Sequence, residues 1–153
     1  MALKRVDYDE RQYAVYARAR AVLPATMATW RQAFARHAGP ARPLTVLDLG
    51  SGVGRYTPAL AEEFGGPVFG VEPSSRMRAV AEESARHDRV TYLPGAADRI
   101  PLPDGSCDLA LLFLVWHHVP DKPLVHEASP RGGAGRMRLS YGSSGRAGRR
   151  APG

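Results

Sequence analysis

The chain has few cysteines and aromatic residues and lacks long apolar runs, and these shortages exclude several classes of protein. Its single cysteine, Cys107, cannot form a disulfide within the chain, which is typical of a reducing compartment. The longest apolar stretch, residues 109–116, is far shorter than the roughly 20 residues that span a bilayer. Charged residues near the N-terminus stand where a signal peptide needs an apolar segment. We therefore expect a cytoplasmic protein with no membrane contact.

Clusters of metal ligands are also missing from the sequence. His117 and His118 are adjacent, so on a helix or strand they point in different directions, and neither has a Cys or carboxylate at a zinc-like spacing. No metal site is predicted. Cys107 precedes an apolar run and is predicted to be a small core residue. The acidic pairs at 62–63 and 82–83 are expected to be solvated helix faces rather than paired catalytic carboxylates.

Positive charge is concentrated at the C-terminal end. The formal net charge is +6, and residues 126–153 carry +5 of it through six arginines and one acid, Glu127. Seven glycines and four serines in the same segment, without apolar periodicity, predict a disordered tail. The rest of the chain is nearly neutral, so nucleic acid is not an expected partner, although an RNA-contacting Arg-Gly tail stays open as an alternative.

A glycine-dense turn follows an apolar run near residue 50. Residues 45–49 have the composition of a buried parallel strand, and residues 55–63 have that of a helix. Glycines between such elements permit a sharp turn and close approach of a ligand, and the amino end of the helix offers N–H groups to it. The pattern predicts a cofactor loop, with Asp48 at the strand end organising it rather than performing chemistry.

The glycine spacing disfavours a dinucleotide cofactor. A G-x-G-x-x-G motif that begins at Gly50 requires glycine where the chain has Arg55. An acid, Glu72, closes the next apolar strand at residues 68–71. A carboxylate at that point can accept hydrogen bonds from both hydroxyls of a ribose, which is a feature of dinucleotide and adenosyl sites alike.

Four ordered motifs resemble those of class I S-adenosylmethionine-dependent methyltransferases of the type 11/25-like kind. They are D-L-G-S-G-V-G at 48–54, E-P-S at 72–74, G-A-A-D at 95–98 after a strand at 90–93, and a proline-rich turn at 100–108 before a strand at 109–115. The resemblance covers about residues 44–123. It implies an α/β, Rossmann-like sheet of order 3-2-1-4-5-7-6, with strands 1 to 4 recognisable, and S-adenosyl-L-methionine as cofactor.

The same resemblance implies the roles of the site residues. The methionine part of the cofactor would be surrounded by Gly50, Ser51, Gly52 and Gly54. The ribose would lie at Glu72 and Pro73, the adenine at Ala96, Ala97 and Asp98, and the sulfonium near Leu114.

One position in the cofactor pocket departs from the family pattern. Many relatives carry an acid where Ala96 stands, and it accepts a hydrogen bond from the adenine amino group. We therefore expect an altered affinity, with Asp98 as a substitute acceptor. His117 and His118 would lie near the methyl donor, where one could orient or deprotonate an acceptor; capping or packing is an equally good interpretation.

The chain is interpreted as three segments. Residues 1–40 are predicted to be a helix pair, at 11–22 and 25–36, the second ending at Gly39-Pro40. The family resemblance makes this pair a lid with candidate residues Tyr8, Tyr13, Tyr16 and Arg18, although packing is the simpler role for the tyrosines. Residues 41–125 form a partial methyltransferase core, and residues 126–153 the tail.

The family pattern stops near residue 125, where relatives continue with further strands. Our hypothesis is a truncation, or a shift of reading frame near residues 125–130, which the other two frames of the downstream DNA would test. The expected function is methyl transfer to a small-molecule acceptor. The alternative is an inactive, truncated fragment that binds the cofactor weakly or not at all. The motifs specify neither the acceptor nor the oligomeric state.

Overall fold

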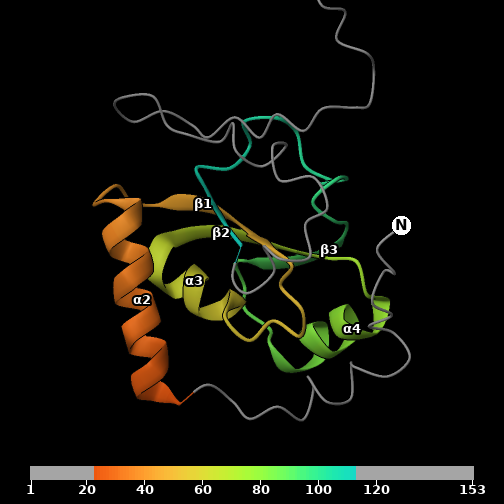
Figure 1. The fold of residues 1–153 in the computed structure, drawn as a ribbon, viewed down its shortest axis with the longest axis horizontal. Helices are drawn as coiled ribbons and strands as arrows, with labels where there is room; N and C mark the ends of the chain where they lie inside the picture. Colours follow the sequence, from red (N-terminus) through yellow and green to blue (C-terminus); the bar gives the residue numbers. More distant parts are fainter. Residues whose placement is uncertain (1–22, 113–153) are drawn as a thin grey trace, which may run out of the picture.

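The computed structural model of the chain describes residues 23–112, in which helices and strands alternate as far as β3 and a further strand follows (Figure 1). Predictions for the helix at 11–22, the lid residues, Leu114, His117, His118 and the basic tail lie outside the described residues. The elements in order are α2 (Pro24–Ala38), β1 (Leu44–Leu49), α3 (Thr57–Phe64), β2 (Gly65–Glu72), α4 (Ser75–Ser84), β3 (Val90–Pro94) and β4 (Leu109–Leu111).

The four strands form one parallel sheet in the order β3-β2-β1-β4. Leu49 at the end of β1 pairs with Val71, and Glu72 at the end of β2 pairs with Pro94 of β3. The carboxyl ends of β1, β2 and β3 therefore meet at one edge of the sheet. This arrangement confirms the predicted α/β Rossmann-like fold and the relative order of strands 1 to 4.

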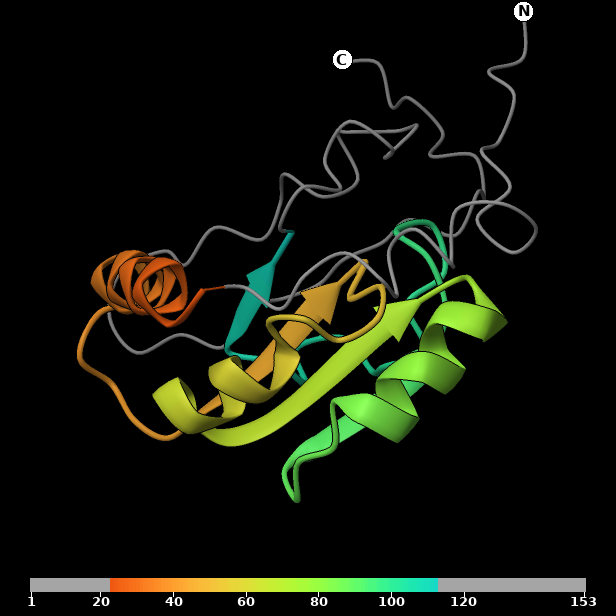
Figure 2. The same cartoon turned by 90° about the horizontal axis from the view of Figure 1, so that it is seen from below.

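Side chains pack on both faces of the sheet at β1, which explains why residues 46–49 are all buried and, apart from Asp48, apolar. Figure 2 shows α3 and α4 lying on the same face. On that face Val46, Val68 and Phe64 form a core to which Phe34 of α2 adds. The opposite face packs Leu47, Leu49 and Val71 against Ile100 and Cys107 from the β3–β4 connection. Cys107 is fully buried, as predicted.

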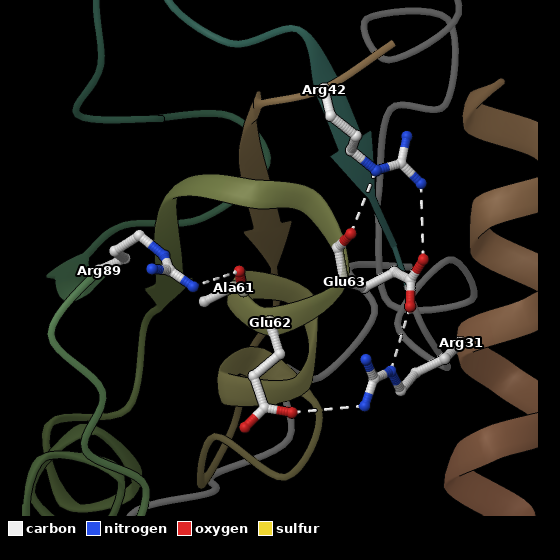
Figure 3. A network of polar contacts seen from close by, with 6 residues as sticks. All are labelled: Arg31, Arg42, Ala61, Glu62, Glu63 and Arg89. Carbon is white, nitrogen blue, oxygen red and sulfur yellow. Dashed lines mark hydrogen bonds and ion pairs between the residues drawn. The ribbon is translucent and has the colours of Figure 1, made fainter. Parts of the chain in front are cut away.

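Helix α2 is held to α3 by ion pairs as well as by apolar contact. It has no fully buried residue, and Trp30 and Phe34 stack on one side of it with ring centroids 5.9 Å apart. Arg31 of α2 pairs through Nε with Glu63 Oε2 at 3.1 Å and through Nη1 with Glu62 Oε2 at 3.3 Å (Figure 3).

A second arginine, Arg42, completes this network from the segment before β1. Its Nη2 lies 3.5 Å from Glu63 Oε1, its Nε donates to the Glu63 carbonyl at 3.1 Å, and its guanidinium lies over the Phe64 ring. The Glu63 side chain is 22% exposed and that of Glu62 is 56% exposed. The expectation of a solvated acidic pair is therefore wrong for Glu63, because two arginines from distant segments enclose it.

The junction between α3 and β2 differs from the prediction. Strand β2 begins at Gly65, immediately after the helix, rather than at Val68. Gly65 makes this possible because its φ of 71° is left-handed, and its N–H caps α3 by donating to the Ala61 carbonyl. The predicted stop of α2 is confirmed: the helix ends at Ala38, and Gly39 follows with a φ of 74°.

Candidate functional site

The glycine loop leaves β1 at the carboxyl edge of the sheet and enters α3. Gly50, Gly52 and Gly54 have φ values of 77°, 57° and 77°, in the left-handed region where other residues are strained. Gly50 N donates to the Val71 carbonyl at 2.7 Å, and Gly54 N donates to the Ser51 carbonyl at 2.9 Å. The loop is therefore folded on itself and tied to the end of β2.

Glu72 lies directly against this loop. Its side chain is 6% exposed; Oε2 accepts from Gly52 N at 3.1 Å, and Oε1 accepts from Ser74 N at 2.9 Å. The predicted loop and the predicted ribose acid, 20 residues apart in sequence, thus lie in direct contact.

Two side chains that the sequence did not assign to the site, Ser74 and Arg78, stabilise the turn that follows Glu72. Ser74 caps α4 by accepting from Met77 N at 3.2 Å. Arg78 Nη1 donates to the carbonyls of Glu72, at 2.5 Å, and Pro73, at 3.0 Å. Pro73 itself is exposed. These contacts fix the turn from β2 into α4 and therefore the direction of the Glu72 side chain.

Asp48 lies beneath the loop, on the face of the sheet that carries α3. It is 5% exposed, and its Oδ2 accepts from the Thr57 hydroxyl at 2.7 Å. Burial raises the pKa of Asp48 to about 6; the Thr57 hydrogen bond opposes this rise, and the negative charge of Glu72 adds to it. Asp48 therefore connects β1 to the first residue of α3, which is the organising position expected for it.

Tyr92 of β3 is a second residue that the sequence did not single out. Its hydroxyl donates to the Ala85 carbonyl at 2.9 Å. A Cβ placed on Gly70 would lie 2.7 Å from Tyr92 Cδ1, and one on Gly54 would lie 2.8 Å from the Ala85 Cβ and 3.0 Å from Tyr92 Cζ. The signal available in the sequence was Gly70, since a glycine inside a strand often marks a close approach.

The open side of the loop fits a ligand cradle. A Cβ on Gly52 would have Met77 Sδ, at an ordinary 3.9 Å, as its nearest neighbour among residues 23–112, so this part of the chain leaves space beside Gly52. Ser51 Oγ is buried and has no hydrogen-bond partner within residues 23–112. Such a hydroxyl is a group that a bound ligand or water satisfies. The glycine loop, Ser51 and Glu72 together fit an adenosyl cofactor.

The segment predicted to contact adenine lies beyond β3, on the side of the sheet where Glu72 ends β2. Ala96 and Arg99 exchange two backbone hydrogen bonds of 3.1 and 2.9 Å, which places Ala97 and Asp98 at the tip of a tight turn. Ala97 packs against the core on the face of the sheet opposite α3 and α4, whereas Asp98 is exposed. Gly95 is required before this turn because a Cβ there would lie 2.7 Å from the Arg99 carbonyl oxygen.

A parallel sheet with a glycine loop and an acid at adjoining strand ends defines a Rossmann-like domain for an adenosyl or nucleotide cofactor. Residues 47–129, more than half of the chain, match the family model described as a methyltransferase domain. The chain belongs to this methyltransferase family, as the motifs predicted. Among the described residues, no helix combines the length and apolarity needed to cross a bilayer.

Several known proteins are similar to the chain. The probable chloroplastic tocopherol O-methyltransferase of Oryza sativa subsp. japonica is 34% identical over 85 residues, covering 53% of this chain and 24% of that protein. An uncharacterized methyltransferase of Mycobacterium bovis is 37% identical over 90 residues, covering 59% of this chain and 36% of that protein. The chain thus spans about a quarter to just over a third of the length of these curated relatives.

Solved structures show the same relationship. A putative methyltransferase from an antibiotic biosynthesis pathway of Anabaena variabilis superposes with a TM-score of 0.56 at 32% identity, covering 61% of this chain and 36% of that one. An S-adenosylmethionine-dependent methyltransferase of Mesorhizobium loti has a TM-score of 0.50 at 32% identity, covering 56% of this chain and 40% of that one.

Proposed function

We propose that the chain binds S-adenosyl-L-methionine at the glycine loop and Glu72 and serves methyl transfer to a small-molecule acceptor. The observation that carries this proposal is the 3.1 Å hydrogen bond from Gly52 N to Glu72 Oε2, because it joins the two predicted halves of the cofactor site. Membership of the methyltransferase family supports the choice of cofactor. The names of the rice and Anabaena relatives support an acceptor of small size.

The residues of the chain would act by binding and orientation. Glu72 would accept hydrogen bonds from the ribose, the glycines would admit the methionine part without a clashing Cβ, and Ala97 would contact adenine through its backbone. The cofactor, when bound, supplies a methyl group activated by a sulfonium. Transfer to an electron-rich atom is accelerated by correct positioning of the two reactants, so the proposal requires no general base.

Some parts of the proposal rest on the sequence alone. We propose that three residues lie near the reacting centre: Leu114, His117 and His118. We also propose that Asp98 accepts a hydrogen bond from adenine in place of the acid found in many relatives. A cytoplasmic location is proposed from the single cysteine.

Calorimetric titration of S-adenosyl-L-methionine into the purified 153-residue chain tests the proposal. We expect saturable binding by the unaltered protein and by Glu82→Ala, which removes an exposed acid from α4. Glu72→Ala should bind at least about tenfold more weakly, since a carboxylate that bonds to ligand hydroxyls contributes at least about 1.4 kcal/mol. Absence of binding by folded, unaltered protein would refute the proposal and favour the inactive-fragment alternative.

A further inference from the structure

We propose that Tyr92 is a positioning residue of the cofactor loop: its ring holds Gly54 of the loop apart from Gly70 of β2, and its hydroxyl ties the ring to the end of α4. The inference concerns the ligand-free loop itself. Only its consequence for S-adenosyl-L-methionine affinity rests on the proposed function.

The ring occupies the space that two glycines leave open. A Cβ on Gly70 would lie 2.7 Å from Tyr92 Cδ1 and 2.9 Å from Cε1, and a Cβ on Gly54 would overlap the Tyr92 hydroxyl. Gly70 belongs to β2 and Gly54 to the loop, so one aromatic ring packs against both segments and lies between these two glycines. The same Cβ on Gly70 would lie 3.0 Å from Ser51 Oγ, so the loop, the strand and the ring meet at this glycine.

The Tyr92 hydroxyl adds a hydrogen bond to the contacts of the ring. It donates to the Ala85 carbonyl, and Ala85 N in turn donates to the Ala81 carbonyl at 2.8 Å, so Tyr92 is tied to the last turn of α4. Burial raises the pKa of Tyr92 to about 12, the Thr57 hydroxyl opposes this rise, and the charge of Asp48 adds to it. Tyr92 is therefore a neutral donor near pH 7.

The position of the loop decides whether the cofactor site exists. Gly52 N must lie within hydrogen-bonding distance of Glu72 Oε2, and Gly54, two residues later, rests on the ring. Removal of the ring leaves a void under the loop, and protein interiors relax toward such voids. We infer that Gly54 would then move into the space of the ring and that this shift of the loop would break the bond between Gly52 and Glu72. Tyr92 need not touch the ligand to have this effect.

Hydrogen exchange of the ligand-free, full-length chain tests the inference. Tyr92→Val removes the ring and Tyr92→Phe keeps it; Thr91→Val is the matched control on the same strand, at an exposed position. We expect the amides of Gly52 and Gly54 to exchange about tenfold faster in Tyr92→Val, and within about threefold of the unaltered rate in the other two variants. Equal acceleration of the central β1 amides, such as that of Leu47, would show general destabilisation and overturn the inference.

A compensating substitution gives a second, independent test. Gly70→Ala should push against the ring and accelerate exchange of the loop amides, and Tyr92→Val in the same chain should relieve this clash because valine has no δ atoms. If Gly70→Ala perturbs the loop equally in both backgrounds, the ring is not the spacer. Should Tyr92→Val fail to fold, unaltered loop exchange in folded Gly70→Ala would overturn the inference by itself.

Ligand affinity separates this inference from the proposed function. S-adenosyl-L-methionine should bind about tenfold more weakly to Tyr92→Val and within about threefold of normal to Tyr92→Phe. If the unaltered chain binds no cofactor, the proposed function fails, while the exchange results still decide the role of Tyr92. Normal affinity of Tyr92→Val would overturn the positioning role.

Discussion

The buried carboxyl of Asp48 makes the stability of the domain depend on pH. Its pKa is about 6 instead of 3.8, because burial disfavours the charged form and Glu72 adds negative charge nearby. Between these two values the native protein keeps a proton that the unfolded chain has released. The native state therefore binds more protons in this window, and the free energy of unfolding falls as the pH rises through it. Well above pH 6 the native protein has also released this proton, and the free energy of unfolding falls no further on account of Asp48.

The substitution Asp48→Asn isolates this effect. The interval from 3.8 to about 6, at about 1.4 kcal/mol per pH unit, corresponds to a loss of about 3 kcal/mol. Asparagine keeps an oxygen that can accept from the Thr57 hydroxyl, but it cannot ionise. We therefore expect the stability of Asp48→Asn relative to the unaltered protein to rise by about 3 kcal/mol between about pH 3 and pH 7.5.

Urea unfolding at a series of pH values, followed by far-UV circular dichroism, measures this difference. Asp98→Asn is the matched control because Asp98 is an exposed aspartate, and its stability difference should show no such step. If the free energies of unfolding of Asp48→Asn and the unaltered protein differed by the same amount at every pH, the reasoning would be refuted. Asp48 would then not hold an additional proton in the native state.

Two further predictions concern the contacts around the site. Glu63→Gln should lower the free energy of unfolding by about 1 kcal/mol at low salt, and Glu62→Gln should lower it by less than about 0.5 kcal/mol. The reason is that, of the two, Glu63 is the more buried and is paired with two arginines. Equal losses for the two variants in urea unfolding would contradict this. Ser74→Ala should cost about 1 kcal/mol through the lost cap of α4 and accelerate exchange of the Met77 amide first, whereas Ser75→Ala, at an exposed position, should have little effect.

The sequence predicted the parts of the fold that depend on local pattern and ordered motifs. Strand β1 is rich in apolar residues because side chains pack on both of its faces, and α2 ends where a left-handed Gly39 permits it. The loop and Glu72 were predicted as one site because parallel strands bring their carboxyl ends together, and the Gly52–Glu72 bond fits that reasoning.

The parts that the sequence did not predict depend on contacts between distant segments. Glu63 is enclosed by arginines that lie on α2 and before β1, and no pattern within α3 indicates this. Tyr92 is a typical strand residue, and its position under the loop follows only from the pairing of β3 with β2. Thr57 became a site residue because its hydroxyl meets Asp48 across the start of α3.

Unfavourable features of the domain gather around the glycine loop, and this concentration is itself an argument for a binding site there. Two buried carboxyls, Asp48 and Glu72, repel each other, and Ser51 Oγ is buried without a partner within the described part of the chain. Three left-handed glycines add the large entropy loss that glycine suffers on folding. A sequence selected for stability alone would replace such groups with apolar ones. Their retention at one sheet edge is explained if Glu72 and the loop must present acceptors and open backbone to a ligand.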